Sequence, residues 1–198
     1  LPADQLQERI HEAGYDRPII VQYVEYIGKV FTGDFGTTIT DNQPVTEVLL
    51  TYGAATFELV FYAFIIALVV GIPLGMVAAA KREKATDAGL RVGAILFYAT
   101  PVFFSGLLAK LVFSVWLGWF PVSGRASVRT EIALTREGGT GIYLIDAIKS
   151  GNPAYVQDVL LHAFLPSMVL GLLTASIFLR LVRTNVIGTH NMPYIDAA

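Results

Sequence analysis

Histidine and acidic side chains are the first candidates for chemistry in this sequence, and their spacing does not form a catalytic or metal centre. His11-Glu12 begins the pattern of a zinc-protease helix, but Tyr15 stands where that pattern needs its second histidine. His162 and His190 lie near opposite ends of one apolar block, too far apart to share a metal ion. The sequence contains no cysteine, which excludes disulfides, thiolate-ligated zinc and thiol catalysis in this chain.

Motifs for nucleotide or ester chemistry are also missing from the sequence. It has no Gly-Lys-Ser/Thr phosphate loop and no Gly-x-Ser-x-Gly elbow. Any nucleotide hydrolysis linked to this protein is therefore expected in another chain, and we expect no catalytic residue, no cofactor and no metal here. The net charge of -2 gives no indication of a nucleic-acid partner, and none is expected.

The elements that must position any functional side chain are three long apolar blocks. Only 15% of the 198 residues are charged, and the mean hydropathy is +0.58. Residues 60–80 and 159–179 contain no Asp, Glu, Lys or Arg, and each is long enough to cross a bilayer, which takes about 20 apolar residues. Segments within them are apolar on all sides, unlike the striped core helices of a soluble domain. The sequence predicts an all-α, polytopic membrane helix bundle with about three spans.

The second block, residues 92–124, is too long for one straight span. Pro101 is expected to kink this block or to split it into two helical pieces, because proline lacks a backbone N–H. Lys110 is the one charged residue in the block, and a charge at such a depth faces a cavity or extends to the interface. The sequence leaves both alternatives open for Lys110. Lys110 and Ser105 are our candidates for a translocation path, whereas Glu58, near the outer end of the first span, is expected at the interface.

Two glycines four residues apart, Gly71 and Gly75, put a smooth patch on one face of the first span, where a second helix can approach closely. Pro73 lies between them and leaves a backbone carbonyl without its usual donor. Ordinary helix packing is the first interpretation of these three residues. A moving joint, to which Pro101 would also contribute, is the alternative.

Lysine and arginine near the span ends predict the orientation, because short cytoplasmic loops carry an excess of both. We expect residues 81–91 and 183–198 to be cytoplasmic, and residues 1–52 and 118–158 to be outside. The basic residues that carry this prediction are Lys81, Arg82, Lys84, Arg91, Arg180 and Arg183.

The pattern divides the chain into three parts. The first part is expected to contain short helices at 6–13 and 23–31 and a turn at 33–36. The loop inside the second part is long enough to have local structure of its own. The three parts are residues 1–52 as an extracytoplasmic segment, residues 53–183 as the membrane core with its extracytoplasmic loop at 118–158, and residues 184–198 as the start of a cytoplasmic segment.

Five groups of residues, in this order along the chain, resemble the dipeptide/oligopeptide permease family of ABC importers, and specifically the first of its two permease subunits. Each group alone carries little information, but their order and the matching topology make the resemblance specific over nearly the whole chain. The groups are GDFG at 33–36, PVTE at 44–47, GIPLG at 71–75 with AAAKR at 78–82, LGWFPVSGR at 117–125, and LP at 165–166 with RLVR at 180–183.

The resemblance implies a six-span permease of the type I ABC importer kind in the inner or plasma membrane, of which this fragment would hold spans two to four. We therefore expect the protein to continue at both ends. The implied partners are a second permease subunit, two cytoplasmic ATPases, an extracytoplasmic substrate-binding protein and the lipid bilayer. The implied mechanism is alternating access that moves dipeptides or oligopeptides inward. Nickel chelates, haem and glutathione are alternative solutes, and a passive channel or a membrane scaffold are the alternatives from other classes.

A cytoplasmic coupling helix with a Glu-Ala-Ala-x-x-x-Gly pattern, which docks on the ATPase, also belongs to the resemblance. Asp196-Ala197-Ala198 matches its start, with aspartate in place of glutamate, in a segment that begins at Tyr194. The glycine of the pattern would fall beyond the last residue, so most of the coupling helix is expected to be absent from this sequence.

Overall fold

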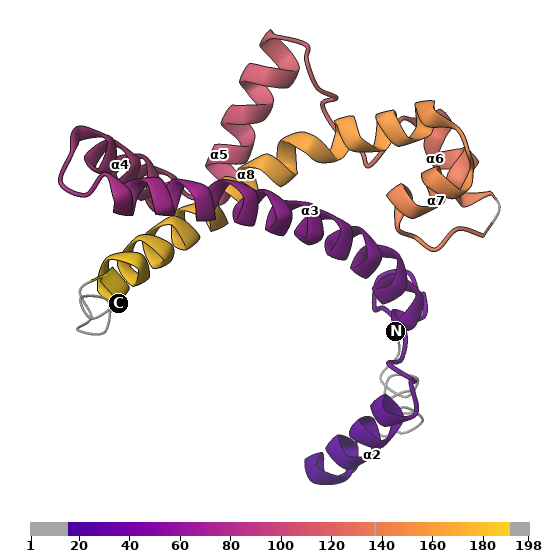
Figure 1. The fold of residues 1–198 in the computed structure, drawn as a ribbon. Coiled ribbons are helices and arrows are strands. Elements are labelled where there is room, and N and C mark those ends of the chain that lie inside the picture. The colour runs from indigo at the N-terminus through magenta and orange to yellow at the C-terminus, as the bar shows by residue number, and fades with distance from the viewer. Residues whose placement is uncertain (1–15, 137, 191–198) are drawn as a thin grey trace. The chain divides into compact units, whose positions relative to one another are not determined.

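The computed structural model describes residues 16–136 and 138–190, and these residues fold into helices joined by turns, without a β-sheet (Figure 1). The all-α prediction is therefore confirmed for the described part of the chain. The chain divides into two compact units, residues 1–53 and residues 54–198.

The first unit contains α2 (Ile19–Phe31), an amphipathic helix in which no residue is buried. The helix predicted at 23–31 is confirmed and begins earlier, at Ile19. Its apolar face is exposed within the unit, as at Ile20 and Val24. The helix predicted at 6–13 lies outside the described residues.

A glycine turn follows α2, as predicted for residues 33–36. Gly33 and Gly36 have φ angles of 85° and 75°, a region that glycine enters without steric cost. The N–H of Gly36 donates to Asp34 Oδ1 at 3.0 Å, and the N–H of Val45 donates to the Gly36 carbonyl at 2.9 Å. The turn therefore leads directly into the next helix.

Helix α3 (Val45–Ala80) begins well before the apolar block 60–80 and before residue 53, the predicted start of the membrane core. Glu47 lies in its first turn, where an acidic side chain interacts favourably with the helix dipole. Gly53 lies within this helix and does not interrupt it. Both α3 and α8 (Pro153–His190) are long and apolar enough to cross a membrane. A bent pair of helices raises the number to three if the pair counts as one span, which agrees with the prediction of about three spans for the described residues.

The bent span is built from α4 (Ala85–Ala99), α5 (Val102–Ala109) and the π-helical segment η1 (Lys110–Trp116). The chain direction changes by 101° at the break between α4 and α5. Thr100 and Pro101 have ψ angles of 130° and 131°, which are extended rather than helical. Of the two alternatives predicted for this block, the structure therefore has two helical pieces.

Helices α3 and α8 have the same chain direction and cross where glycines of both helices meet the other helix (Figure 1). A Cβ atom at Gly71 would lie 2.8 Å from the Ala175 carbonyl oxygen, and one at Gly75 would lie 2.9 Å from the Leu179 carbonyl oxygen. Gly171 of α8 is as close to Ile66 of α3, with 2.7 Å between that Cβ position and the Ile66 side chain. The two backbones therefore approach more closely than any larger residue at these positions would allow.

The loop between η1 and α8 has the local structure expected of it. Helices α6 (Val128–Thr135) and α7 (Tyr143–Lys149) pack beside the first turns of α8 (Figure 1). A small apolar core holds them there, formed by Ala126, Leu134, Tyr143, Ala147 and Val159. We call this end of the second unit the loop end, and the opposite end, with the basic residues 81–91 and 180–183, the basic end.

Candidate transport site

Charged side chains in the second unit gather in three places: at the loop end, at the basic end, and around a cavity between them. Each place joins segments that are distant in the sequence. Glu58 at the loop end and Asp87 at the basic end are paired with arginines, whereas a lysine beside the cavity has no ion-pair partner among the described residues. Charged residues with a protein partner stabilise the fold, whereas a charged residue without one is available to bind a solute.

Glu58 forms the centre of the loop end and is buried, with 7% of its surface exposed. Arg125 donates from Nη2 to Glu58 Oε2 at 2.7 Å, and Tyr62 donates its hydroxyl to Glu58 Oε1 at 2.9 Å. The backbone N–H groups of Tyr143 and Leu144, at the start of α7, also donate to this carboxylate, at 3.3 and 2.8 Å. The sequence predicted Glu58 at the interface, and the structure adds that the loop covers this residue and supplies its hydrogen bonds.

Arg125 is itself held on three sides. Its guanidinium lies 3.8 Å from the centre of the Tyr143 ring, and Nη2 also donates to the Gly141 carbonyl at 2.8 Å. The Tyr143 hydroxyl donates to Glu131 Oε1 at 2.8 Å. Burial, followed by this hydrogen bond to a carboxylate, raises the pKa of Tyr143 to about 12. The loop is thus fastened to α3 by a connected polar network.

The basic end is held by Asp87 and Arg183. Arg183 donates from Nε and Nη2 to the two oxygens of Asp87, and Asp87 also accepts the N–H of Glu83 at 3.2 Å. Arg91 lies 3.6 Å away and adds a second, weaker charge contact. The sequence used Arg183 to predict the orientation, and the structure gives it a buried partner. Arg180, one turn earlier, lies 5.3 Å over the Tyr98 ring.

Two cavities lie between these ends and share Gly124, His162 and Pro166 as walls. One, of about 270 Å³, is bounded by Glu58 and Arg125. The other, of about 180 Å³, is bounded by Lys110 together with residues 121–124 and the part of α8 around Pro166. Of the two alternatives left open for Lys110, the structure favours the one in which it faces a cavity.

The remaining candidates from the sequence lie elsewhere. Ser105 is half-buried on α5 and lines neither of these cavities. Gly71 and Gly75 face α8, and Pro73 lies inside α3 between them. The coupling residues lie outside the described part of the chain, and they are Tyr194, Asp196, Ala197 and Ala198.

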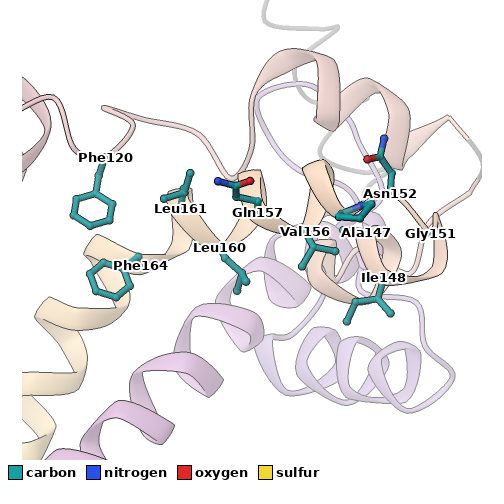
Figure 2. Close-up of a pocket in the computed structure, with 11 residues that line it drawn as sticks. Phe120, Ala147, Ile148, Gly151, Asn152, Val156, Gln157, Leu160, Leu161 and Phe164 are labelled. Carbon is teal, nitrogen blue, oxygen red and sulfur yellow. The ribbon is translucent and has the colours of Figure 1, made fainter.

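A larger and more open cavity of about 750 Å³ lies beside the first turns of α8 (Figure 2). Its walls are mainly apolar, and Phe120 and Phe164 stack there with ring centres 4.9 Å apart. Asn152 and Gln157 contribute amide groups, and none of its lining residues carries a charge.

Three residues of these sites were not recognised in the sequence: Asp87, Arg125 and His162. Arg125 lies 67 residues from Glu58, and Arg183 lies 96 residues from Asp87. Such pairings follow from the fold and have no local pattern. The one available signal was chemical, because each of these residues is polar and lies beside or within an apolar block.

Close-packed parallel helices, a broken span and paired charges at both ends define a polytopic α-helical membrane protein. The comparison with known families then identifies the class of membrane protein. Residues 71–198 match the family described as binding-protein-dependent transport system inner membrane component, so the chain belongs to this family of transport permeases. It is accordingly a multi-pass protein of the inner membrane, as expected.

Curated relatives agree with this assignment. The chain is 34% identical over 191 residues to the di/tripeptide transport system permease protein DppB of Pseudomonas aeruginosa, covering 96% of this chain and 56% of the relative. It is 34% identical to the probable D,D-dipeptide transport system permease protein DdpB of Escherichia coli, covering 99% and 57%. It is 37% identical to the putrescine export system permease protein SapB of Escherichia coli, covering 83% and 51%. The chain thus spans about half the length of the curated relatives it matches.

Proposed function

We propose that this chain is part of the membrane-spanning permease subunit of an ATP-driven ABC importer that moves dipeptides or oligopeptides inward. The observation that carries the proposal is the family match over residues 71–198, which contain the parallel contacts between α3 and α8 and the broken span. Relatives named as dipeptide permeases support the choice of solute.

The proposed mechanism is alternating access driven by partner chains. Two cytoplasmic ATPases bind and hydrolyse ATP, and a second permease subunit completes the path through the bilayer. An extracytoplasmic binding protein delivers the solute. The segment from Tyr194, including Asp196-Ala197-Ala198, transmits the movement of the ATPases to the helices. The break at Pro101 and the close-packed segment 71–75 are the joints at which the helices can reorient.

The proposed orientation places the basic end in the cytoplasm and the loop end outside. Gathering of the basic residues at one end of the second unit supports it. A cysteine at Lys84 should then be labelled by a membrane-impermeant maleimide only from the cytoplasmic side, and one at Ser127 only from outside. The reverse labelling would overturn the orientation and, with it, the proposed position of the coupling segment.

Reconstitution tests the transport activity. The full-length permease is assembled in proteoliposomes with its second permease, the two ATPases and the binding protein, and uptake of a labelled dipeptide is measured. We expect uptake that requires ATP and stops when the catalytic glutamate of the ATPase is replaced. Uptake that continues without ATP would indicate a passive channel, and a complex that moves no solute would indicate a scaffold.

The direction of transport is measured in the same preparation. One relative is named for putrescine export, so loading the vesicles with labelled solute and following its exit provides the necessary comparison. Exit driven by ATP, with no uptake, would contradict the proposed import. Competition by nickel chelates, haem or glutathione against the labelled dipeptide distinguishes the alternative solutes.

A further inference from the structure

Lys110 is a charged residue in a membrane-spanning segment without a protein partner. In the described ranges its ammonium group makes no ion pair and no hydrogen bond, whereas Glu58, Asp87 and Arg183 are all paired. A cation in such a segment is costly unless it faces a cavity or a partner. Lys110 is one of the residues that line the cavity of about 180 Å³, so this cavity is the nearest place in which its charge could find a partner.

His162 lines the same cavity and presents the complementary group. Its Nδ1 atom lies 2.8 Å from the Asp158 carbonyl oxygen on its own helix. A carbonyl oxygen can only accept, so Nδ1 carries the hydrogen, and in the neutral ring Nε2 is an acceptor. The Nε2 edge points away from the Asp158 carbonyl, and it has no partner among the described residues. Nδ1 also lies 3.3 Å from Asp158 Oδ1. The cavity therefore has a cationic donor, Lys110, and, while the ring is neutral, a hydrogen-bond acceptor, His162.

Apart from Ser123, the other lining residues are apolar or glycine. They include Val122 and Leu165, together with Pro166 at the point where α8 contains its internal proline. The volume is below the roughly 300–1,000 Å³ typical of a site that encloses a drug-sized ligand. The cavity therefore suits one end of a solute better than a whole solute.

We propose that Lys110 and His162 form a binding site for the C-terminal residue of a peptide, in which the ammonium of Lys110 pairs with the free α-carboxylate. The amide N–H of the same terminal residue is the donor for His162 Nε2, and the apolar walls accept its side chain. This proposal rests on the proposed function and adds to it a chemical requirement, a free carboxylate on the solute.

The first test measures transport in the assembled complex, with the binding protein present at a saturating concentration. The variants are Lys110→Met and Lys110→Arg, with Lys149→Met in the exposed end of α7 as the matched control. Loss of a hydrogen bond between charged groups costs about tenfold or more in an equilibrium constant. We expect Lys110→Met to lower the turnover of a labelled dialanine at least about tenfold, and Lys110→Arg and Lys149→Met to retain most of it.

A second measurement distinguishes recognition from a merely structural role. An N-acetylated dialanine is activated with a water-soluble carbodiimide, which couples carboxylates to nearby amines, and labelled lysines are located by mass spectrometry. Coupling at Lys110 should be reduced by unlabelled dialanine but not by dialanine amide, whereas coupling at Lys81 and Lys149 should be unaffected by either. His162→Ala should weaken the protection of Lys110, and His162→Gln should retain more of it.

Three results would overturn the site. They are full turnover by Lys110→Met, equal protection of Lys110 by dialanine and its amide, and absence of coupling at Lys110 in an active complex. If instead the wild-type complex shows no ATP-dependent uptake while dialanine still protects Lys110, the site stands and the proposed function fails. The two proposals are therefore separated by the same preparation.

Discussion

Asp87 and Arg183 form a two-pronged ion pair across 96 residues of sequence, with Nε to Oδ1 at 2.6 Å and Nη2 to Oδ2 at 2.8 Å. The Asp87 side chain is completely enclosed by the surrounding protein. The pair connects the first turn of α4 to the last turns of α8. It thereby holds the short basic connection after α3 next to the helix that leads toward the proposed coupling segment.

Replacing Asp87 should loosen the basic end. Asp87→Asn keeps the shape but leaves the Arg183 charge uncompensated, so the variant should unfold at a lower temperature than the wild type. Trypsin cleavage after Arg82 should also become faster. Arg91→Gln is the matched control, because Arg91 is half-exposed and makes only a 3.6 Å contact with Asp87. Equal behaviour of the two variants would show that the pair contributes nothing specific.

Enlarging Gly71 should disturb the contact between α3 and α8. The new methyl group of Gly71→Ala would lie 2.8 Å from backbone and side-chain atoms of α8, so the helices must separate, at a cost of about 1–3 kcal/mol. Gly93→Ala is the control, because Gly93 lies in α4 with open space around it. Chemical unfolding in detergent should show Gly71→Ala as destabilised and Gly93→Ala as neutral or slightly stabilised. Similar stabilities would disprove the close contact.

Replacing Pro101 should reduce the bend between α4 and α5. In Pro101→Ala the backbone N–H at position 101 can donate to the Phe97 carbonyl and continue the helix. Ile95 and Leu108 are both exposed and can carry spin labels. The distance between the two labels, measured by double electron–electron resonance, should then increase. Pro153→Ala should leave that distance unchanged, because Pro153 is the first residue of α8 and interrupts no hydrogen bond. An unchanged distance in Pro101→Ala would mean that packing on α8, and not the proline, makes the bend.

Alkaline pH should weaken the loop end through Tyr143. Burial and the hydrogen bond to Glu131 raise the pKa of Tyr143 from 10.0 to about 12 in the folded protein. The folded state therefore binds the phenolic proton more tightly than the unfolded state does. The contribution of protonated Tyr143 to stability is complete below pH 10 and is lost as the pH rises toward 12. Stability measured across this range should fall in the wild type, and the fall should be smaller in Tyr143→Phe. Identical pH profiles would assign the fall to other groups.

The spans were predictable from the sequence because lipid requires long apolar helices, and residues 60–80 and 159–179 satisfy that requirement without any partner. The same holds for Pro101, whose effect follows from its own missing N–H. The start of α3 was not predictable in this way, since residues 45–59 are less uniformly apolar and only their continuation into the span makes them one helix.

The polar contacts could not be predicted, because each depends on two segments brought together by the fold. Glu58 was assigned to the interface on its position alone, and its burial depends on Arg125 from the distant loop. Lys110, in contrast to Glu58, was a site candidate from the sequence. Its type and depth identified it as a candidate, but only the folded chain shows the cavity and His162 beside it.

The glycine contacts between α3 and α8 have a mechanical consequence. Backbones that touch at Gly71, Gly75 and Gly171 cannot slide past one another, since every step would force a larger side chain into the place of a glycine. The two helices can therefore change their arrangement only by turning about this contact. A tilt applied at the basic end reaches the loop end as an opposite swing, with the glycine contact as the pivot, so the pair works as a lever and not as a piston.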